Sequence, residues 1–150
     1  MDEIDLKILR LIQAKPDISL ADLGPAVGLS QTPCWRRLKK LEQNKVILGR
    51  AVLLDPSAIG LSVNVFAHLK LTNHRGETLE TFEEAVAQCP EIIECFSMSG
   101  ASDYMLRIVA KSIDHYERFM KDRLSHLPEV VSINSSFALK CVKDTRILPV

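Results

Sequence analysis

Apolar residues recur three and four positions apart over residues 1–45, and this spacing is the period of an amphipathic helix. The positions are Ile4, Ile8, Leu11 and Ile12, then Leu20, Leu23 and Val27, and finally Cys34, Leu38 and Leu41. They predict three short helices. Gly28 gives the chain the backbone freedom that a tight turn needs before the third helix, so the pattern indicates a helix-turn-helix.

Capping residues stand where the first two helices are expected to begin. The pairs with capping spacing are Asp2 with Asp5 and Ser19 with Asp22. The second helix also contains Gly24-Pro25. Pro25 lacks an N–H and crowds the carbonyl group of Ala21, which normally costs about 3 kcal/mol, so we expect a kinked or irregular second helix.

From residue 61 onward the periodicity changes to alternation of apolar and polar residues, which is typical of strands with one solvated face. The pattern predicts strands over 61–71, 92–99, 104–110 and 131–141, and amphipathic helices over 79–89 and 113–127. Gly100-Ala101-Ser102-Asp103 is expected to be a hairpin turn. The order βαββαβ predicts an antiparallel sheet with both helices on one face, the ferredoxin-like arrangement.

The segment that joins these two patterns is apolar and β-branched over residues 46–54, around Gly49-Arg50. It predicts a strand or small hairpin, which would form the wing of a winged helix-turn-helix. We therefore expect an α+β protein with a winged helix-turn-helix domain over 1–50, a linker strand and hinge over 51–60, and a ferredoxin-like domain over 61–150. Arg50 could touch a DNA backbone or be a plain linker residue.

The third predicted helix carries a cationic face opposite its apolar stripe. Ser30 or Thr32 can cap it, and Pro33 falls in its first turn, where no N–H donor is missed. The outward positions are Thr32, Arg36, Lys39, Lys40 and Gln43. Alone, such a helix is usually a solvated surface helix. As the last helix of a helix-turn-helix, it is the expected recognition helix for a DNA major groove.

Position along this helix suggests a role for each residue. The candidates for reading base edges, because they lie near its start, are Gln31, Thr32, Trp35 and Arg36. The candidates for holding phosphates are Arg37, Lys39 and Lys40. Trp35 lies at the edge of the apolar stripe, so we expect packing rather than DNA contact. Cys34 lies on the stripe, which favours a buried structural thiol over a redox switch.

The charge of the 150-residue chain is unevenly distributed, although its formal net charge is zero. Residues 1–50 carry nine Lys/Arg and six Asp/Glu, and the remainder carries ten and thirteen, which gives +3 and −3. A basic module joined to an acidic one indicates a polyanion-binding part. The four cysteines form no C-x-x-C pair, so neither a zinc site nor a disulfide framework is predicted. No long apolar run or signal peptide is recognised, and we expect a cytoplasmic protein without a cofactor.

Leu29-Ser30-x-Thr32-Pro33-Cys34-x-x-Arg37-Leu38-x-x-Leu41-Glu42, followed by Ile47 and Gly49, resembles the DNA-binding domain of the Lrp/AsnC transcriptional regulators. Gly100-x-x-Asp103-Tyr104 is similar to the G-x-x-D-Y/F motif of the amino-acid-sensing domain in that family. The resemblance extends over nearly the whole chain. It implies a sequence-specific regulator of double-stranded DNA that responds to a small amino acid. The Trp35-containing, short-tailed chain resembles a branch of the family linked to sulfur amino acids, and this resemblance implies cysteine as the effector.

In the family, the G-x-x-D-Y/F loop lies at a contact between dimers and binds the effector. By this resemblance Gly100 would let backbone N–H groups approach a carboxylate, and Asp103 next to Tyr104 would receive an ammonium group. Apolar residues that could surround the effector side chain are Ile113, Phe137, Ala138 and Leu139. The alternative is a simple hairpin turn in which Asp103 bonds its own backbone.

A sheet with helices on one face leaves its other face in need of cover. Apolar residues expected on that face are Phe66, Phe96, Ile108 and Phe137. Self-association would cover them, and the resemblance implies sheet-on-sheet homodimers that assemble into tetramers or octamers. A dimer would present two recognition helices about 34 Å apart, one DNA turn.

Two other functions deserve comparison with a regulator. Ferredoxin-like domains also host enzymes, and His68, His74, His115 and His126 are the candidate bases. None of them lies in a metal or nucleophile motif, and we expect no catalysis. An architectural protein that wraps DNA with little sequence choice is the other alternative. A regulator should instead prefer its site by about a thousandfold or more at moderate salt.

Overall fold

The computed structural model describes residues 1–73 and 75–150, and the chain forms two compact units. The first unit comprises Met1–Leu53 and Lys143–Val150, and the second comprises Leu54–Val142. Residues 143–150 therefore group with the first unit. His74, one of the four candidate bases, lies outside the described residues.

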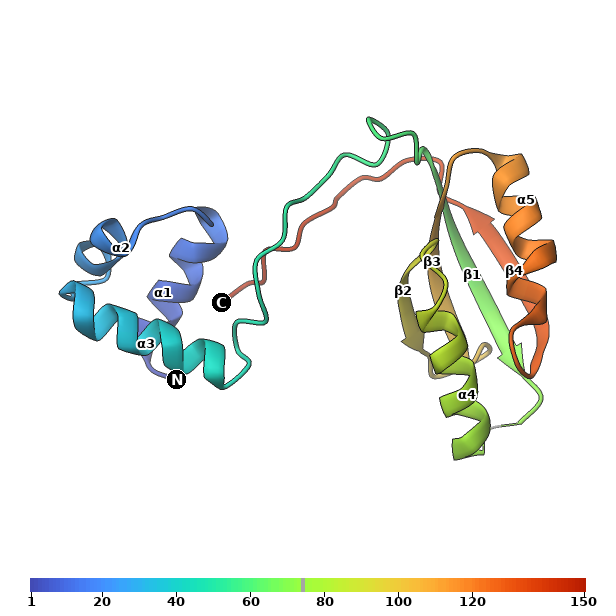
Figure 1. The fold of residues 1–150 in the computed structure, drawn as a ribbon, viewed down its shortest axis with the longest axis horizontal. Helices are drawn as coiled ribbons and strands as arrows, with labels where there is room; N and C mark the ends of the chain where they lie inside the picture. Colours follow the sequence, from blue (N-terminus) through green and yellow to red (C-terminus); the bar gives the residue numbers. More distant parts are fainter. Residues whose placement is uncertain (74) are drawn as a thin grey trace. The chain divides into compact units, whose positions relative to one another are not determined.

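The first unit contains three helices: α1 (Glu3–Ala14), α2 (Leu20–Ala26) and α3 (Gln31–Gln43) (Figure 1). Asp2 and Asp5 form a reciprocal capping box, and the Ser19 hydroxyl accepts a hydrogen bond from the Asp22 N–H, as predicted. The buried core contains Ile8, Leu9, Leu23, Val27, Cys34, Leu38 and Leu41. This core confirms the helical spacing that the sequence predicted.

The predicted wing is absent. Residues 46–54, all of which are described, contain no strand, and Leu48 and Val52 are 90% and 86% exposed. A single apolar segment cannot form a strand unless another strand pairs with its N–H and C=O groups. No described segment of this chain does so here.

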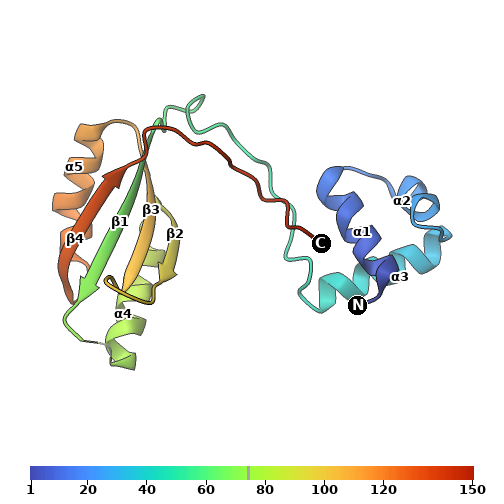
Figure 2. The ribbon, with the colours of Figure 1, turned by 180° about the vertical axis from the view of Figure 1, so that it is seen from behind.

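The second unit has the predicted βαββαβ order. Its elements are β1 (Val63–Leu71), α4 (Gly76–Ala87), β2 (Ile92–Ser97), β3 (Tyr104–Ala110), α5 (Ile113–Asp122), a 3-10 turn (Leu124–His126) and β4 (Val130–Phe137). The strands form an antiparallel sheet in the order β2-β3-β1-β4. Helices α4 and α5 cover one face, and Figure 2 shows the other face uncovered.

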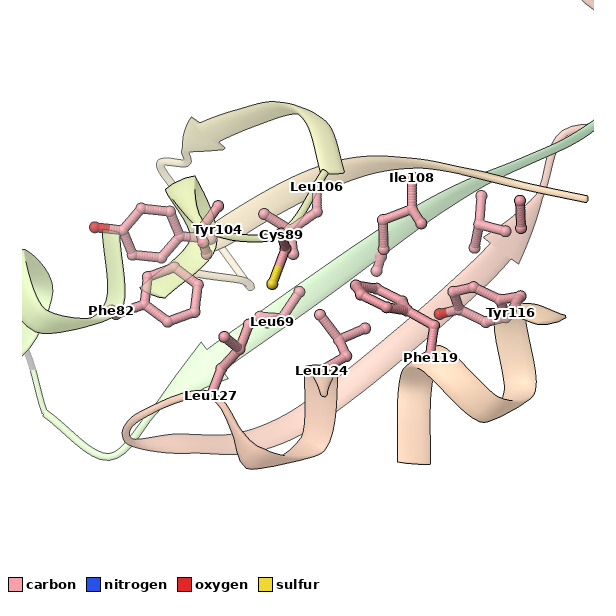
Figure 3. Packing of buried hydrophobic residues seen from close by; sticks show 14 of the residues in the cluster. Leu69, Phe82, Cys89, Tyr104, Leu106, Ile108, Tyr116, Phe119, Leu124 and Leu127 are labelled. Atoms are coloured by element: carbon pink, nitrogen blue, oxygen red, sulfur yellow. The ribbon is translucent and has the colours of Figure 1, made fainter. Parts of the chain in front are cut away.

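The core of this unit lies between the sheet and its helices (Figure 3). Phe82 from α4 contacts Tyr104 with ring centroids 4.6 Å apart, and both side chains are buried. Phe119 of α5 and Leu124 of the 3-10 turn are buried in the same core. Leu69, Leu106 and Ile108 face these helices from the sheet, and each is fully buried.

Two residues predicted on the uncovered face lie on the helix side. Ile108 and Phe137 both pair with Val65, which is fully buried in the core, and paired residues of an antiparallel sheet share a face. The Phe137 ring contacts the Tyr116 ring edge-on, with centroids 5.5 Å apart. The prediction of an open-face position for these two residues was therefore wrong.

Two predicted elements end earlier than their apolar patterns. The helix over 113–127 stops at Asp122 and continues as the 3-10 turn, and the last strand stops at Phe137, so Leu139 and Cys141 lie outside it. Leu139 is fully exposed. Alternation alone cannot define where a strand ends, because pairing requires a neighbour, and β1 begins at Val63, opposite this end of β4.

Candidate nucleic-acid interface and effector site

The recognition helix α3 is amphipathic as predicted. Cys34, Leu38 and Leu41 are buried, whereas Thr32, Arg36, Lys39, Lys40 and Gln43 are exposed on the opposite side. Ser30 is the N-cap residue, but its side chain makes no capping hydrogen bond, and the Thr32 side chain is exposed. The N–H groups of the first turn therefore have no side-chain cap from Ser30, and helix N-termini in this state attract anions.

Gly24 sets how closely α3 follows α2. A Cβ at this position would lie 2.8 Å from the Leu29 carbonyl oxygen, and the Leu29 N–H donates to the Gly24 carbonyl at 2.9 Å. Gly28 has φ +77°, the left-handed conformation that glycine tolerates best. The turn of the helix-turn-helix thus depends on two glycines, of which the sequence pattern identified only Gly28.

Pro25 does not interrupt α2, contrary to the expected irregularity. The helix continues through Pro25 to Ala26, and Val27 is its C-cap. Pro25 lies in the last turn, so it deprives only the Ala21 carbonyl of an intrahelical donor. Because Ala21 is exposed, water can satisfy that carbonyl.

Trp35 is 47% exposed and lies outside the buried core of the first unit. The expectation that its indole covers the core was therefore wrong. The wheel position at the edge of the stripe was correct, but Trp35 is not among the partly buried residues that pack against this core. Half of a large aromatic surface thus stands on α3 beside Gln31 and Arg36, which are both exposed.

Arg37 forms ion pairs within the first unit. Its Nη1 lies 2.7 Å from Asp2 Oδ2 and 2.8 Å from Asp5 Oδ1. Hydrogen bonds that Arg37 donates to the carboxylates of Asp5 and Asp2 raise the pKa of Arg37, and the Asp5 N–H together with Arg37 lowers the pKa of Asp2. The residue predicted to hold a phosphate therefore joins α3 to the N-terminus of α1. No local pattern links Asp2 and Asp5 with Arg37, since more than thirty residues separate them.

The other cations of α3 differ from one another. Lys39 Nζ lies 2.6 Å from Glu42 Oε2, so part of its charge is neutralised. Within the part of the chain that the structure describes, neither Arg36 nor Lys40 forms an ion pair. These two residues are the cations of α3 that are available to a polyanion.

The Gly100 loop is fixed to the adjacent strand by Asp103. The Asp103 N–H donates to the Leu69 carbonyl, and Asp103 Oδ2 accepts from the Leu71 N–H, both at 2.8 Å. The Met98 N–H donates to the Asp103 carbonyl at 2.8 Å, and Gly100 has φ +123°. The Asp103 carboxylate thus accepts from the backbone of the neighbouring strand β1. This contact is neither the bond to its own backbone that a simple hairpin turn would show nor the predicted contact with an ammonium group.

Two further polar contacts adjoin this loop. His68 Nδ1 lies 3.3 Å from Ser102 Oγ. The Tyr104 hydroxyl donates to Glu83 Oε1 at 2.6 Å, and burial together with Glu83 raises the pKa of Tyr104. Neither partner could be predicted from the sequence, because alternation indicates the face of a residue but not its neighbour on another element.

Tyr104 also lines a cavity of about 430 Å³ between α4 and β2. Glu83, Cys95 and Ser97 line it as well. Burial and the nearby Glu83 raise the pKa of the Cys95 thiol to about 11, so this thiol stays protonated at neutral pH. A protonated thiol is a weak nucleophile. Cys34 and Cys89 are buried, whereas Cys141 and, although its thiol is partly shielded in this cavity, Cys95 are exposed.

The apolar residues predicted around the effector lie at the other end of the sheet. Tyr104, directly after Asp103, pairs with Leu69 near the end of β1, whereas Phe137 pairs with Val65 near its start. Four residues of strand separate these points by roughly 13 Å. Ile113, Ala138 and Leu139 are all exposed. One chain therefore does not bring the loop and these residues into a single pocket, and their grouping around an effector at a contact between dimers stays a prediction.

A metal-binding cluster and a membrane-spanning helix are both absent from the described ranges. These ranges contain no group of three His, Cys, Asp or Glu side chains placed to hold a metal ion. Among the described helices, none has the length and apolar character needed to cross a membrane. His126 is exposed, and His115 is half-buried with a buried Nδ1 that has no hydrogen-bond partner among the described residues.

Comparison with known proteins agrees with this architecture. Residues 1–42 match the AsnC-type helix-turn-helix domain, and residues 64–148 match the Lrp/AsnC ligand binding domain. The chain is 37% identical over 150 residues to the DNA-binding transcriptional activator DecR of Escherichia coli (strain K12), covering 100% of this chain and 99% of that protein. It is 40% identical over 142 residues to the Bkd operon transcriptional regulator of Pseudomonas aeruginosa, covering 95% and 93%.

Two solved structures share the fold. An AsnC family transcriptional regulator from Agrobacterium tumefaciens has a TM-score of 0.92 and 42% identity, with 99% of this chain and 97% of that chain covered. A transcriptional regulator of Neisseria meningitidis in complex with L-Met has a TM-score of 0.92 and 32% identity, with 99% and 96% covered.

Proposed function

Since this chain belongs to the Lrp/AsnC family of transcriptional regulators, we propose that α3 reads an operator in the DNA major groove. The observation that carries this proposal is the exposed face of α3, where Arg36 and Lys40 form no ion pair among the described residues and Trp35 is half exposed. Arg36, with Gln31, Thr32 and Trp35, reads base edges. Lys39 and Lys40 hold phosphates, and Arg37 instead keeps α3 on α1.

Substitutions of two cations separate sequence reading from general affinity. Arg36→Ala should weaken a preferred site by about 1–3 kcal/mol while changing random DNA little, because a bidentate contact with guanine is lost. Lys40→Ala should weaken both DNAs about equally and reduce the salt dependence. The measurement is titration of the full chain with operator and random duplexes at several salt concentrations. Equal loss on both DNAs for Arg36→Ala would remove Arg36 from the reading role.

Trp35 is the only tryptophan, so its emission reports directly on α3. Operator DNA should change this emission, and random DNA should do so only at lower salt. A protein that wraps DNA without sequence choice would respond to both duplexes alike at moderate salt. This result would contradict the regulator proposal.

Homodimer formation through the uncovered face of the sheet is the second part of the proposal. Phe66, Phe96, Met105 and Val109 lie on this face, and Phe96 is 49% exposed. At its centre Arg107 lies 3.3 Å from Glu94 and donates to Asn64 at 3.2 Å, so the charges are already paired. Exposed aromatic surface beside the paired charge of Arg107 suits a second copy. Dimers would then assemble further, into tetramers or octamers.

Phe96→Arg tests this interface. Dimer formation would bury the new charge away from water, which is costly. Sedimentation equilibrium should therefore show the monomer–dimer equilibrium shifted toward the monomer. The matched control is Ile93→Arg, because Ile93 is an exposed residue of the same strand at the register irregularity. This substitution should leave the molecular mass in solution unchanged. A monomeric chain before any substitution would contradict the proposal.

The effector in this proposal is a small amino acid bound at the Gly100 loop. Gly100 has a backbone conformation that other residues rarely adopt, and the hydroxyl of Ser102 lies beside His68. These features support binding of the amino-acid carboxylate by loop N–H groups, with Asp103 and Tyr104 fixing the loop. Sulfur-containing amino acids are the first to test, cysteine on grounds of family resemblance and methionine because the Neisseria meningitidis regulator was solved with L-Met.

A thermal-shift screen of the twenty amino acids identifies the effector, because a ligand of the folded state raises the melting temperature. Asp103→Asn should keep the shift, since an amide oxygen can still accept from the Leu71 N–H, whereas Asp103→Ala should abolish it. If Asp103→Asn also abolishes the shift, the carboxylate charge binds the ammonium group directly. A shift that survives Asp103→Ala would place the ligand elsewhere.

A further inference from the structure

The end of the chain, at Leu148 and Val150, lies beside α1, although it follows the sensing unit in the sequence (Figure 1). The Gln13 side-chain amide makes two hydrogen bonds with the Leu148 backbone: it accepts from the N–H at 2.7 Å and donates to the carbonyl at 3.2 Å. Arg10 Nε donates to the Val150 carbonyl oxygen at 2.6 Å. Glu3 lies 3.2 Å from Arg10 Nη1 and orients its guanidinium. This face of α1 therefore holds the tail through its backbone.

The tail gives the two units a second covalent connection. The chain passes from the first unit to the second after Leu53 and returns after Val142. The return path leaves the sheet after Ala138, whose N–H donates a hydrogen bond to the Asn64 carbonyl at 2.9 Å. Leu139 and Val142 are 100% and 89% exposed, so the first part of the path from Ala138 to the α1 contacts belongs to neither core.

The return path is the shorter of the two tethers. About ten residue steps lie between Ala138 and Leu148, which span at most roughly 35 Å at full extension. The outward path has about sixteen steps between Ile47, which packs on the first core, and Val63, which begins β1, and it spans up to roughly 56 Å. The contacts of Arg10 and Gln13 therefore limit how far and how freely the DNA-binding unit can turn.

We propose that this tail is an orientation tether: by binding α1, it restricts the DNA-binding unit and so determines which half-site spacing a dimer accepts. The inference rests on the proposed DNA-binding function. Helix α1 is a suitable attachment point, because Ile8 and Leu9 share a core with Cys34, Leu38 and Leu41 of α3. Arg37 also fixes α3 to Asp2 and Asp5 at the start of α1. A restraint on α1 is thus a restraint on the recognition helix.

The expected effect is confined to DNA that engages two recognition helices. Binding of the second helix depends on its effective concentration at the second half-site, and this concentration falls when a tether is lengthened or lost. Binding to one half-site needs no defined orientation between units. Loss of the tail contact should therefore weaken two-site binding, relax spacing preference and leave one-site binding unchanged.

The test uses the full chain with Gln13→Ala, and Gln88→Ala as a matched control on exposed Gln88 at the end of α4. A second variant lacks residues 144–150. DNA is a duplex selected by the unsubstituted protein, together with the same duplex carrying five extra base pairs between half-sites, and a duplex with one half-site. Binding is measured by fluorescence anisotropy, and the Trp35 melting curve reports whether the first unit stays folded.

Gln13→Ala and the deletion should weaken binding to the selected duplex by about threefold to tenfold. Both changes should also reduce, by a similar factor, the preference of the protein for the selected duplex over the duplex with five extra base pairs. Gln88→Ala should change neither quantity. Unchanged spacing preference in both tail variants overturns the inference, and equal loss on the one-site duplex assigns the tail to folding of α1 instead. Failure of the unsubstituted protein to prefer any duplex would contradict the proposed function, which is a separate result.

Discussion

The two units of this protein are built on unequal cores. Among the described residues, the first has seven buried apolar residues, and the second has fifteen, so most of the apolar stabilisation belongs to the second. The first unit supplements its core with side-chain bridges: Arg37 with Asp2 and Asp5, and Gln13 with the tail. The DNA-binding unit is therefore the part whose shape depends on polar contacts, and contacts of this kind respond to pH, salt and tethering.

The chain carries its own probes for this comparison. Trp35, its only tryptophan, lies in the first unit, and both tyrosines, Tyr104 and Tyr116, lie in the second. Tryptophan emission and tyrosine near-UV circular dichroism can therefore follow the two units separately in one sample.

The largest effect is expected for Phe82→Ala, at the centre of the second core. Phe82 is fully buried against Tyr104, and its loss should lower the free energy of unfolding by about 3–5 kcal/mol. Urea unfolding followed by the tyrosine signal measures the change, with fully exposed Leu139→Ala as the control. If the Trp35 transition shifts by the same amount, the two units unfold together and the comparison between them fails.

Gly24→Ala should be the most damaging small change in the first unit. The added Cβ would lie 2.8 Å from the Leu29 carbonyl oxygen, and relief of this overlap should cost about 1–3 kcal/mol. The Trp35 transition should move, and operator affinity should fall because α3 is displaced. Gly49→Ala, where nothing lies within 4 Å of the new Cβ, should change neither.

Tyr104→Phe should have a moderate effect on the second unit. It keeps the ring contact with Phe82 but removes the hydrogen bond to Glu83, at a cost of about 1 kcal/mol. Glu83→Gln retains an acceptor oxygen and should cost less. A loss as large as that of Phe82→Ala would mean that the hydroxyl, not the ring, determines this part of the core.

The smallest effect is expected from pH. The Asp5 N–H and Arg37 lower the pKa of Asp2 below its ordinary 3.8. The stability that this carboxylate contributes is fully present above pH 3.8, and it is lost as the pH falls through the lowered pKa. The melting temperature of the first unit, followed by Trp35 emission, should therefore drop slightly between pH 6 and pH 3. The drop should be smaller in Arg37→Gln. The same drop in both proteins would show that Arg37 does not contribute to it.

Apart from residues 46–54, where the predicted wing is absent, the sequence by itself determined which segments are helices and strands, because an amphipathic period is a local property. Ile8, Leu23, Leu38 and Leu106 are buried where the period places them, and Gly28 occupies the left-handed turn position. The cationic face of α3 and the Gly100-x-x-Asp103-Tyr104 loop were also readable, since each lies within one short stretch. Their roles in binding DNA and an effector remain proposals.

Only the tertiary structure decided which residues meet across the chain. It placed Arg37 on Asp2 and Asp5, left Trp35 exposed, moved Ile108 and Phe137 to the helix side, and separated Phe137 from the Gly100 loop. It also brought Leu148 to Gln13, which stands 135 residues earlier. Ion pairs, strand register and tail docking depend on distances between elements, and a local pattern of apolar and polar residues contains no information about those distances.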